Sequence, residues 1–389
     1  MRRVYLDHAA TTPLHPAVVE AMLPYLRERF GNASSVHAWG REAREAVEAA
    51  REQVARLIGA QPDEITFTSG ATESDNLAIL GVAREQREAR GRDHVITSAI
   101  EHHAVLHACE ALQHEGFTVT VLPVDRYGLV DPDDVRRAIT PRTALVTIMY
   151  ANNEVGTIEP VAEIGRLCRE AGVLFHTDAV QAAGHIPCRV DELHCDLLSL
   201  TAHKMYGPKG TGALYVRRGV RLRPLQYGGG HEFGRRPGTE NVAGIVGLGK
   251  AAELAAAEMA AEAERQRALR DRFIAQVFER ISDVRLNGHP VKRLPNNINL
   301  SFAGVEGESL LLNLDLAGIA CSTGSACSSG TTEPSHVLQA LGVPYEVIRC
   351  SLRFTLGRDT TADDLDYTLE TLVEVVGRLR ALSPLTASA

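Results

Sequence analysis

The sequence predicts an α/β protein: a mainly parallel sheet with helices on both faces, followed by a smaller α+β unit. Three observations support this fold class. Short runs rich in β-branched residues alternate with helical patterns from about residue 60 to 216, a proline-free stretch rich in Ala, Glu and Arg follows, and further strand and helix patterns close the chain. Such alternation is typical of a parallel sheet whose two faces are covered by helices.

Seven strands are predicted in the alternating region. They lie at 64–69, 94–98, 118–123, 143–150, 172–178, 196–201 and 212–217. Segments between them, such as 76–91 and 161–172, are apolar at helical spacing and end in glycine, which commonly stops a helix. Another helical pattern, at 43–60, precedes the first strand, and the first sixty residues are expected to pack against both units.

The last third of the chain predicts the smaller unit. The stretch 242–282 indicates one or two long helices that lead into it. A strand at 296–302, a helix at 307–318, a strand at 351–356 and a closing helix at about 361–382 follow. We therefore predict a large unit at 16–256 and a small α+β unit formed by 1–15 and 257–389, which carries a loop rich in Gly and Ser.

The composition argues against several classes of protein. Hydrophobic residues make up 44% and charged residues 23%, as in an ordinary globular chain. The formal net charge of −8 offers no basic surface to nucleic acid. No apolar run is long enough for a membrane span, and the N-terminus lacks the apolar stretch of a signal peptide. Seven scattered cysteines without a CxxC pair favour a reducing, cytoplasmic location and predict neither disulfides nor zinc ligation.

Polar residues gather where the predicted strands end, which is the edge at which α/β sheets bind ligands. Residues 69–72, Ser-Gly-Ala-Thr, lie between a strand and a helix. Free backbone N–H groups and the positive end of a helix favour a phosphate at such a junction. A simple turn into a helix has the same sequence pattern, so this signal is weak when it stands alone.

Two ionisable residues follow at later strand ends. Asp178 closes the predicted strand 172–178, and Lys204 lies between a strand and a turn rich in Gly and Pro. Poor solvation at such a place favours a neutral amine, which can attach to an aldehyde. The plainer alternatives are a helix cap for Asp178 and a surface loop position for Lys204. An anion cradle, an aspartate and a desolvated lysine in this order are what pyridoxal phosphate requires of a protein.

Two more residues complete such a pocket. His102 follows a predicted strand, where its ring could stack on a flat cofactor, while its neighbour His103 would point elsewhere. A capping or core role is the alternative for either histidine. Arg353 lies inside an apolar strand, where an unpaired guanidinium would be costly. A substrate carboxylate would pair with both arms of this guanidinium, and an internal ion pair is the alternative.

A cysteine in an unusual place adds a further signal. Cys327 lies in "GSACSSG", a composition that favours a mobile loop over a packed core. Free cysteine is normally among the most buried residue types. A free thiol on such a loop is unusual, and packing does not explain its position.

Several longer motifs carry a family resemblance. They are "YLDHAATTP", "GNASSVHAWG", "FTSGATESDNLAI", "EHHAVL", "NNEVGTI", "DAVQAAG", "SLTAHKMYGPKGTGALYVR", "GGGHEFGRRPGTEN", "VEGESLL", "CSTGSACSSGTTEPSHVLQALG" and "SLRFTLGR". With these motifs the chain resembles the cysteine desulfurases of the NifS/IscS type from residue 4 to about 385. These are aminotransferase class V enzymes, and the resemblance implies pyridoxal-phosphate fold type I, the fold of the aspartate-aminotransferase superfamily.

The resemblance also implies roles for individual residues. Lys204 would hold the cofactor, Asp178 would pair with its ring nitrogen, and His102 would stack on the ring and carry protons. Further cofactor contacts are implied for Asn153 and Gln181 at the ring hydroxyl, for Ala71, Thr72, Thr201 and His203 at the phosphate, and for Thr239 from the second subunit of a homodimer. The implied substrate-carboxylate contacts are Arg353 and Asn32. Cys327 would be the catalytic cysteine and a transient iron–sulfur ligand, and no other metal site is implied.

The implied reaction converts L-cysteine to L-alanine and leaves a persulfide on Cys327. The persulfide would pass to a sulfur-acceptor protein, either an iron–sulfur scaffold or a tRNA-thiolation enzyme. The long form of the cysteine loop is typical of desulfurases with such partners, yet a chain that stops at "SPLTASA" lacks the tail with which IscS-type relatives often dock a scaffold. A selenocysteine lyase, an aminotransferase with the same cofactor and a catalytically silent relative are the alternatives. Cys327 argues against the aminotransferase, which needs no thiol.

Overall fold

The computed structural model describes residues 2–323 and 334–382. Its largest sheet has seven strands in the order β2-β8-β7-β6-β5-β3-β4. They are β2 (Ile65–Thr68), β3 (His94–Ser98), β4 (Thr118–Leu122), β5 (Thr143–Thr147), β6 (Leu174–Asp178), β7 (Leu197–Thr201) and β8 (Gly212–Val216). Among these seven strands only β8 runs opposite to its neighbours. The predicted mainly parallel sheet and its seven strands are therefore confirmed.

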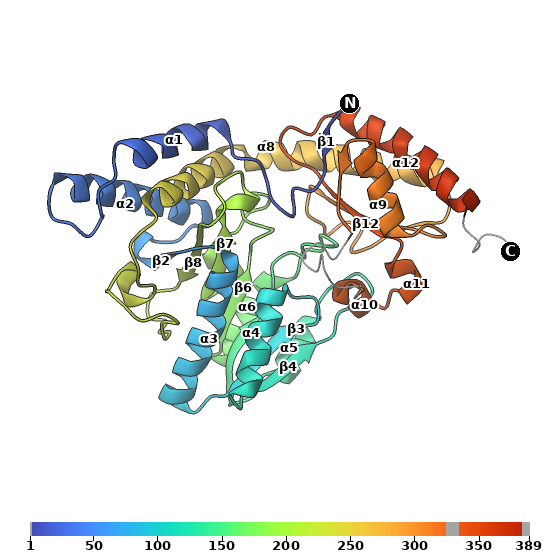
Figure 1. Cartoon of the computed structure of the whole chain (residues 1–389). Coiled ribbons are helices and arrows are strands. Elements are labelled where there is room, and N and C mark those ends of the chain that lie inside the picture. The colour runs from blue at the N-terminus through green and yellow to red at the C-terminus, as the bar shows by residue number, and fades with distance from the viewer. Residues whose placement is uncertain (1, 324–333, 383–389) are drawn as a thin grey trace.

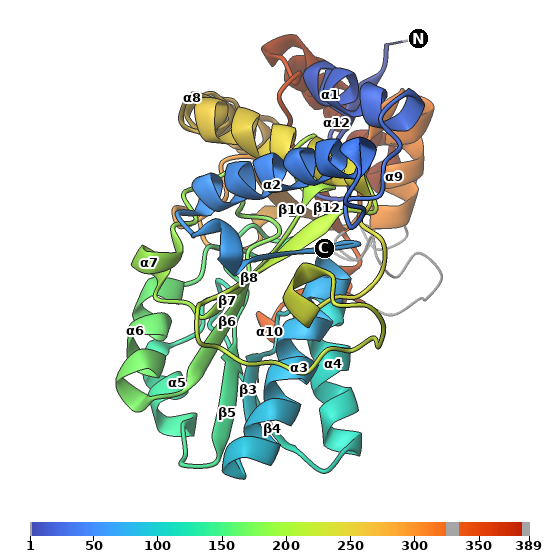
Figure 2. The ribbon, with the colours of Figure 1, turned by 90° about the vertical axis from the view of Figure 1, so that its left-hand side faces the viewer.

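Helices cover both faces of this sheet (Figure 2). α3 (Ala71–Arg90) and α4 (His103–His114) lie on one face, and α5 (Pro132–Ala138), α6 (Val161–Ala171) and α7 (Val190–Leu193) lie on the other. Successive residues of one strand therefore meet different helices. Leu197 packs into the hydrophobic cluster beneath α3 and α4, whereas Leu198 packs into the cluster on the opposite face. This two-sided burial is the reason that the strands are nearly continuous apolar runs.

One long helix joins the two parts of the molecule (Figure 1). α8 (Val242–Arg280) is a single helix of 39 residues, which decides between the one or two helices expected there. Its first half packs against α1 (Pro16–Arg27) and α2 (Ala38–Ile58). Phe273 and Val277 in its second half belong to the core of the smaller unit. α8 passes residue 256 without a break, and the division of the chain at that point stays a prediction.

The sequence pattern does not predict α1, because two prolines interrupt it. Pro16 occupies the first turn, where the missing N–H has no helical acceptor to lose. The Nδ1 atom of His15 caps the same turn by accepting the N–H of Ala17 at 3.0 Å. Pro24 lies inside the helix, which ends soon afterwards at Arg27. The position of a proline within the helix, rather than its presence, decides whether the helix forms.

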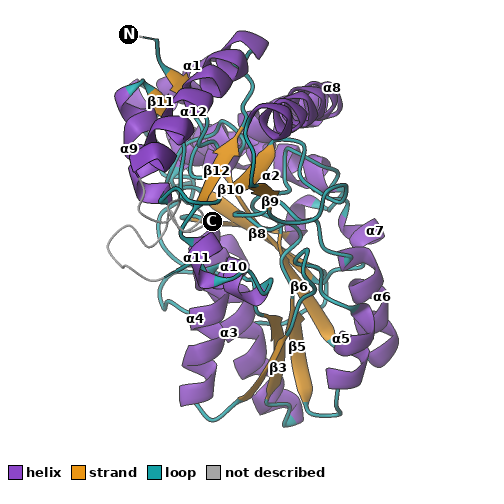
Figure 3. Ribbon diagram, turned by 90° about the vertical axis from the view of Figure 1, so that its right-hand side faces the viewer, coloured by secondary structure: helices purple, strands orange, loops and turns teal. Residues whose placement is uncertain are grey.

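The smaller unit contains two small sheets (Figure 3). β9 (Val284–Leu286), β10 (Asn297–Phe302) and β12 (Ser351–Thr355) form an antiparallel sheet, and β1 (Val4–Tyr5) pairs in parallel with β11 (Ile319–Ala320). The helices of this part of the chain are α9 (Gly307–Leu316), α10 (His336–Ala340), α11 (Tyr345–Ile348) and α12 (Ala362–Leu382). Within the described residues, 3-10 turns occur at η1 (Pro62–Glu64), η2 (Ala202–Lys204) and η3 (Glu232–Gly234).

The N-terminal segment links the two parts of the molecule. β1 belongs to the small unit through its pairing with β11. The chain then runs to the large sheet, where the N–H of Thr12 donates to the carbonyl of His203 at 2.9 Å. Residues 7–12 therefore lie at the junction of the two units. Among the helices in the described ranges, none is long and apolar enough to cross a membrane.

Candidate active site

A cavity of about 600 Å³ opens at the carboxyl ends of β3, β5, β6 and β7. This volume lies in the range of cofactor and substrate sites in proteins. Most of the site residues expected from the sequence line it: Ala71, Thr72, His102, Asn153, Asp178, Gln181, Thr201, His203, Lys204 and Arg353. The topology of the parallel sheet explains this convergence, because the loops that follow neighbouring strands meet at one edge.

Lys204 is held at the floor of the cavity by backbone carbonyls. It ends the short η2 turn after β7, and its Nζ donates to the carbonyl of Ala9 and, at 2.7 Å, to the carbonyl of Ala10. The ring Nε2 of buried His185 donates to the backbone oxygen of Lys204 at 3.2 Å. Lys204 is half-buried, so the alternative of a solvated surface lysine does not apply. Its amine is fixed in direction and faces the cavity.

Asp178 closes β6 and is 5% exposed. Its Oδ1 accepts the N–H of Val180 at 2.9 Å, so the capping role expected as an alternative is present together with the cavity position. Burial raises the pKa of this carboxyl to about 6, while the Val180 N–H and the charge of Lys204 act in the opposite direction. Asp178 is therefore mostly ionised at neutral pH and can face a protonated ring nitrogen.

The start of α3 provides the predicted anion cradle. Gly70 precedes the helix with φ 156°, and a Cβ built on it would meet nothing within 4 Å, so the space beside the first turn is open. The first N–H groups of a helix have no acceptor within the helix and favour an anion there. His203 lies at the same end of the cavity, with its Nδ1 3.2 Å from the hydroxyl of Thr11. Burial lowers the pKa of His203 to about 4, so its ring is neutral at neutral pH.

His102 both caps a helix and lines the cavity. Its Nδ1 accepts the N–H of Ala104 at 3.1 Å, which makes it the N-cap of α4. Burial, and then the neighbouring charge of His103 and Lys204, lowers the pKa of His102 to about 4. The neutral ring therefore carries its proton on Nε2, because Nδ1 is an acceptor in the cap. The two roles weighed for this residue are compatible.

Arg353 makes an internal ion pair at the wall of the cavity. Its Nη2 donates to Oδ1 of Asp7 at 2.7 Å, and its Nη1 donates to the carbonyl of Asn153 at 3.0 Å. The Nε atom is buried and has no hydrogen-bond partner among the described residues. The alternative of an internal ion pair is thus realised, and because Nε is shielded by the protein, a ligand could meet this guanidinium only at its two Nη groups.

Two expected site residues are not among those that line the cavity, and a third lies outside the described residues. Asn32 and Thr239 are exposed and are not among the residues that line it. Cys327 lies outside the described residues. Thr239 was expected to act from a second subunit, and its exposed position leaves that prediction open. The roles of these three residues stay predictions.

The structure adds cavity residues that single-residue reasoning missed. The carbonyls of Ala9 and Ala10 hold the Lys204 amine, and the Ala9 carbonyl also accepts the side-chain amide of Gln181 at 3.1 Å. Asp75 of α3 lines the cavity as well, and burial and repulsion from Asp178 raise its pKa well above the usual range. The motif "YLDHAATTP" marked the N-terminal segment only through the family resemblance, because backbone carbonyls have no sequence signature.

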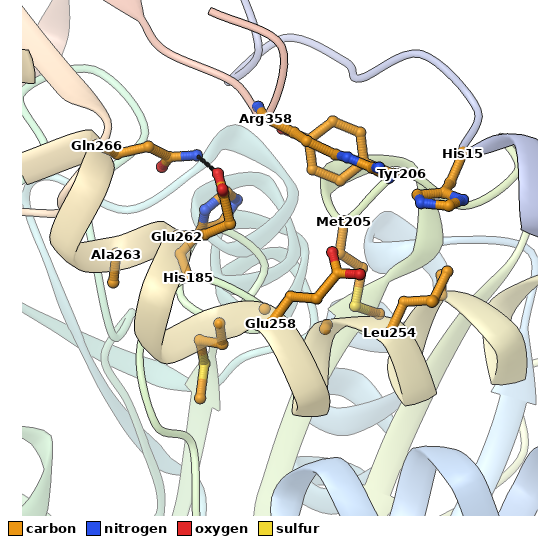
Figure 4. A pocket seen from close by; sticks show the side chains of 14 residues that line it. His15, His185, Met205, Tyr206, Leu254, Glu258, Glu262, Ala263, Gln266 and Arg358 are labelled. Carbon is orange, nitrogen blue, oxygen red and sulfur yellow. Dashed lines mark hydrogen bonds between the residues drawn. The ribbon is translucent and has the colours of Figure 1, made fainter.

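A second, smaller cavity is lined by His185, Met205 and Tyr206, among others (Figure 4). It has a volume of about 40 Å³ and lies between α8 and the turns that hold His185, Met205 and Tyr206. One water needs about 10–15 Å³ of such volume, so the space suits a few waters and not a cofactor. Glu262 on its α8 wall accepts the side-chain amide of Gln266 at 3.2 Å. The larger cavity is therefore the candidate site.

The donor set of the larger cavity fits pyridoxal phosphate. The amine of Lys204 suits its aldehyde, the carboxylate of Asp178 suits its ring nitrogen, and the open first turn of α3 suits its phosphate. Within residues 2–323 and 334–382, no group of three or more His, Cys, Asp or Glu side chains is arranged to hold a metal ion.

Comparisons with known proteins agree with this geometry. The family model described as aminotransferase class-V matches residues 4–368. The chain is 59% identical over 383 residues to the cysteine desulfurase IscS of Dictyoglomus turgidum, which covers 98% of this chain and 97% of that relative. Among solved structures, a NifS-like protein has a TM-score of 0.91 at 39% identity and covers 97% of this chain and 100% of its own. SspA in complex with cysteine has a TM-score of 0.80 at 38% identity, with coverage of 91% and 98%.

Proposed function

The chain belongs to the class-V aminotransferase family and, within it, to the cysteine desulfurases, and from this premise we propose which residues bind the cofactor and substrate and which take part in the reaction. Pyridoxal phosphate is the cofactor, L-cysteine is the substrate, and the fold is pyridoxal-phosphate fold type I. One observation supports the assignment of residues most directly. Lys204, Asp178 and the start of α3 line a single cavity at the carboxyl ends of the sheet.

Lys204 is proposed to hold the cofactor and to move protons at Nζ. When bound, pyridoxal phosphate supplies a carbonyl for the substrate amine and a ring that withdraws electrons from the substrate Cα. The Nζ of Lys204 must leave the carbonyls of Ala9 and Ala10 to do its work, and these carbonyls can receive it again afterwards. Asp178 would pair with the ring nitrogen as a carboxylate, because its pKa of about 6 lies below neutral pH.

His102 is proposed to stack on the cofactor ring and to donate from Nε2. A role as a base at Nδ1 would require the Ala104 N–H to lose its acceptor. Losing a helix cap costs about 1 kcal/mol. For this reason we assign proton transfer first to Lys204, which can move a proton at Nζ without breaking a helix cap.

Arg353 is proposed to bind the substrate carboxylate, with Asn32 as a further contact. Each Nη atom carries a second N–H besides the one it gives to Asp7 or to the Asn153 carbonyl, and these two N–H groups would be the donors to the carboxylate. The thiolate of Cys327 is proposed to attack the substrate sulfur. An S–S bond then forms, the substrate C–S bond breaks, and the electron pair of that bond stays on the substrate carbon, which takes a proton and leaves in L-alanine.

A homodimer is proposed from exposed apolar side chains beside the two residues that lie outside the cavity. Phe30 and Val36 flank Asn32 in the sequence and are 78% and 89% exposed. Tyr227 is 92% exposed and belongs to the same loop region as Thr239. Clustered apolar side chains in water commonly mark an interface. In such a dimer Thr239 would reach the cofactor phosphate of the second subunit.

The persulfide is proposed to pass to a sulfur-acceptor protein in the cytoplasm. An iron–sulfur scaffold and a tRNA-thiolation enzyme are both consistent with a thiol on a Gly- and Ser-rich loop. The scattered cysteines, without a CxxC pair, support a reducing compartment.

One experiment tests the proposal. The purified protein is expected to be yellow, and addition of L-cysteine with a reductant should release L-alanine and sulfide in equal amounts. Cys327→Ala should keep the colour and the spectral response to L-cysteine but form no alanine. Alanine without sulfide, or equal turnover by Cys327→Ala, would refute the assignment of the sulfur-accepting residue.

A further inference from the structure

The helix that follows the cysteine loop packs on the large unit. α10 begins at His336, shortly after the described chain resumes at residue 334. Val337 and Leu338 of α10 share a hydrophobic cluster with Ile100, Met149 and Val155, which lie in the loops after β3 and β5. The chain that leaves the cysteine loop is therefore attached at the rim of the active-site cavity, not to the core of the small unit.

A buried hydrogen bond fixes the start of this helix. The hydroxyl of Ser335 donates to Oε2 of Glu154 at 2.5 Å, and both residues are about 95% buried or more. The same hydroxyl accepts the N–H of Leu338 at 3.1 Å, so Ser335 is also the N-cap of α10. Glu154 is itself fixed, since its backbone N–H donates to the Asn152 side chain and its carbonyl accepts the side-chain amides of Asn297 and Asn299.

Residues 334–340, which follow the cysteine loop, form its C-terminal stem. The contacts of this stem lie next to residues of the active site. Glu154 follows Asn153, whose carbonyl accepts Nη1 of Arg353. His336 donates from Nε2 to the carbonyl of Glu101 at 2.9 Å, and Glu101 precedes His102. The ring of His336 also lies 4.7 Å from the ring of His103. The stem therefore contacts the sequence neighbours of two residues that line the cavity, His102 and Asn153.

The other stem of the loop is fixed at the same place. The N–H of Ser322 donates to the carbonyl of Arg353 at 3.1 Å, and the N–H of Arg353 donates to the carbonyl of Ser322 at 2.6 Å. Ser322 and Ser335 therefore attach the chain on either side of Cys327 to residues that line the cavity or adjoin it.

We propose that the hydrogen bond between Ser335 and Glu154 is a positioning contact, which holds the C-terminal stem of the cysteine loop at the cavity rim and thereby sets how often the Cys327 thiolate meets the substrate sulfur. The inference rests on the proposed function of Cys327 and adds two residues to it. Neither Glu154 nor Ser335 touches the reacting atoms. The two residues act on how often the Cys327 thiolate meets the substrate sulfur. Replacing either of them should therefore leave cofactor binding and substrate binding unchanged.

The test compares Glu154→Gln and Ser335→Ala with wild type and with two controls. Glu159→Gln is a matched control, because Glu159 is also buried and accepts a backbone N–H, that of Val130, at 2.8 Å. Ser335→Thr keeps both the hydroxyl and the cap and should restore wild-type behaviour. Burial raises the pKa of Glu154 to about 7, and the loss or weakening of one hydrogen bond to this carboxyl supports a change of up to about tenfold in the rate of the encounter.

Two readouts are measured on the holoenzyme. The rate at which iodoacetamide alkylates Cys327, followed by peptide mass spectrometry without substrate, should change at least about threefold in both test variants. Single-turnover formation of L-alanine should fall about tenfold, while the amplitude of the spectral response to L-cysteine stays at the wild-type level. Wild-type values for both readouts are expected in Ser335→Thr and Glu159→Gln.

Each contrary result has a distinct meaning. Unchanged alkylation in Glu154→Gln and Ser335→Ala overturns the positioning role, even if alanine forms more slowly. A slower turnover that Glu159→Gln reproduces also overturns it, because the effect would then be general destabilisation. If wild type responds to L-cysteine but forms no alanine, the proposed function fails, whereas the alkylation rates still report on the stem.

Discussion

Replacing Arg353 by lysine should weaken substrate binding, because a point charge cannot reproduce the planar fork of the guanidinium. Arg353 uses Nη2 for Asp7 at 2.7 Å and Nη1 for the carbonyl of Asn153 at 3.0 Å, and its Nε is buried without a partner. A substrate carboxylate at the second N–H of each Nη atom would make two charge-assisted bonds. A lysine at this position that stays paired with Asp7 can donate at most one hydrogen bond to the substrate carboxylate.

The magnitude follows from the loss of one such bond. A hydrogen bond to a charged group contributes about 1.5–3 kcal/mol, which corresponds to about 10- to 150-fold in kcat/KM. The effect should appear mainly in KM, since the carboxylate contact is the same in the ground state and the transition state. Initial rates of L-alanine formation over a range of L-cysteine concentrations measure both constants.

Asp7→Asn provides the control for the ion pair. If Asp7 competes with the substrate for Arg353, its removal should lower KM and at the same time reduce stability, because a buried guanidinium loses its partner. If Arg353 serves only the internal ion pair, both Arg353→Lys and Asp7→Asn change the melting temperature and leave KM within about threefold of wild type. That outcome would refute the assignment of Arg353 to the substrate carboxylate.

Three further predictions concern stability, pH and the cofactor. Glu232→Gln should lower the free energy of unfolding by about 3–5 kcal/mol in urea titrations, since it breaks a buried bidentate pair with Arg51. Asp63→Asn, which loses an exposed pair with Arg218, should cost less than about 1 kcal/mol, and equal losses would contradict the argument. Burial lowers the pKa of His185 to about 4, so folding stability from this group is present above the ordinary pKa of histidine and is lost as pH falls towards 4. His185→Gln should therefore remove about 2 kcal/mol of the loss in stability that wild type shows between pH 7 and pH 5, and an unchanged loss would exclude this histidine as its source. Lys204→Ala should lose the visible absorbance of the attached cofactor and at least about 100-fold of the desulfuration rate. Retention of the wild-type spectrum would exclude Lys204 as the attachment site.

The large unit was predictable because local patterns and topology agree there. β7 is a run of buried residues between a helix and a glycine-rich turn, and a parallel sheet brings its end close to the end of β6. Asp178 and Lys204 could therefore be expected in one cavity from strand ends alone. The chemistry of these side chains, a carboxylate and an amine, then limited the choice of cofactor.

The missed features depend on contacts that leave no local pattern. Every residue has a backbone carbonyl, so the hydrogen bonds that Lys204 donates to Ala9 and Ala10 could not be inferred from the side chains of these alanines. α10 is short and lies after the cysteine loop, yet it packs on Ile100 and Met149 of the large unit. The pairing of Ser335 with Glu154 joins residues far apart in the sequence. Such contacts follow from the tertiary structure, and propensity does not encode them.

The position of the Lys204 amine depends on both parts of the molecule. Its acceptors, Ala9 and Ala10, belong to a segment that begins in the small unit, where β1 pairs with β11. Asp7 lies two residues before Ala9 and is the carboxylate that Arg353 of β12 holds. Should the substrate carboxylate compete with Asp7 for Arg353, its binding would also release the start of the segment that fixes Lys204. Carboxylate recognition in the small unit and release of the amine in the large unit would then be linked through one stretch of backbone, because only a few peptide units separate the two contacts.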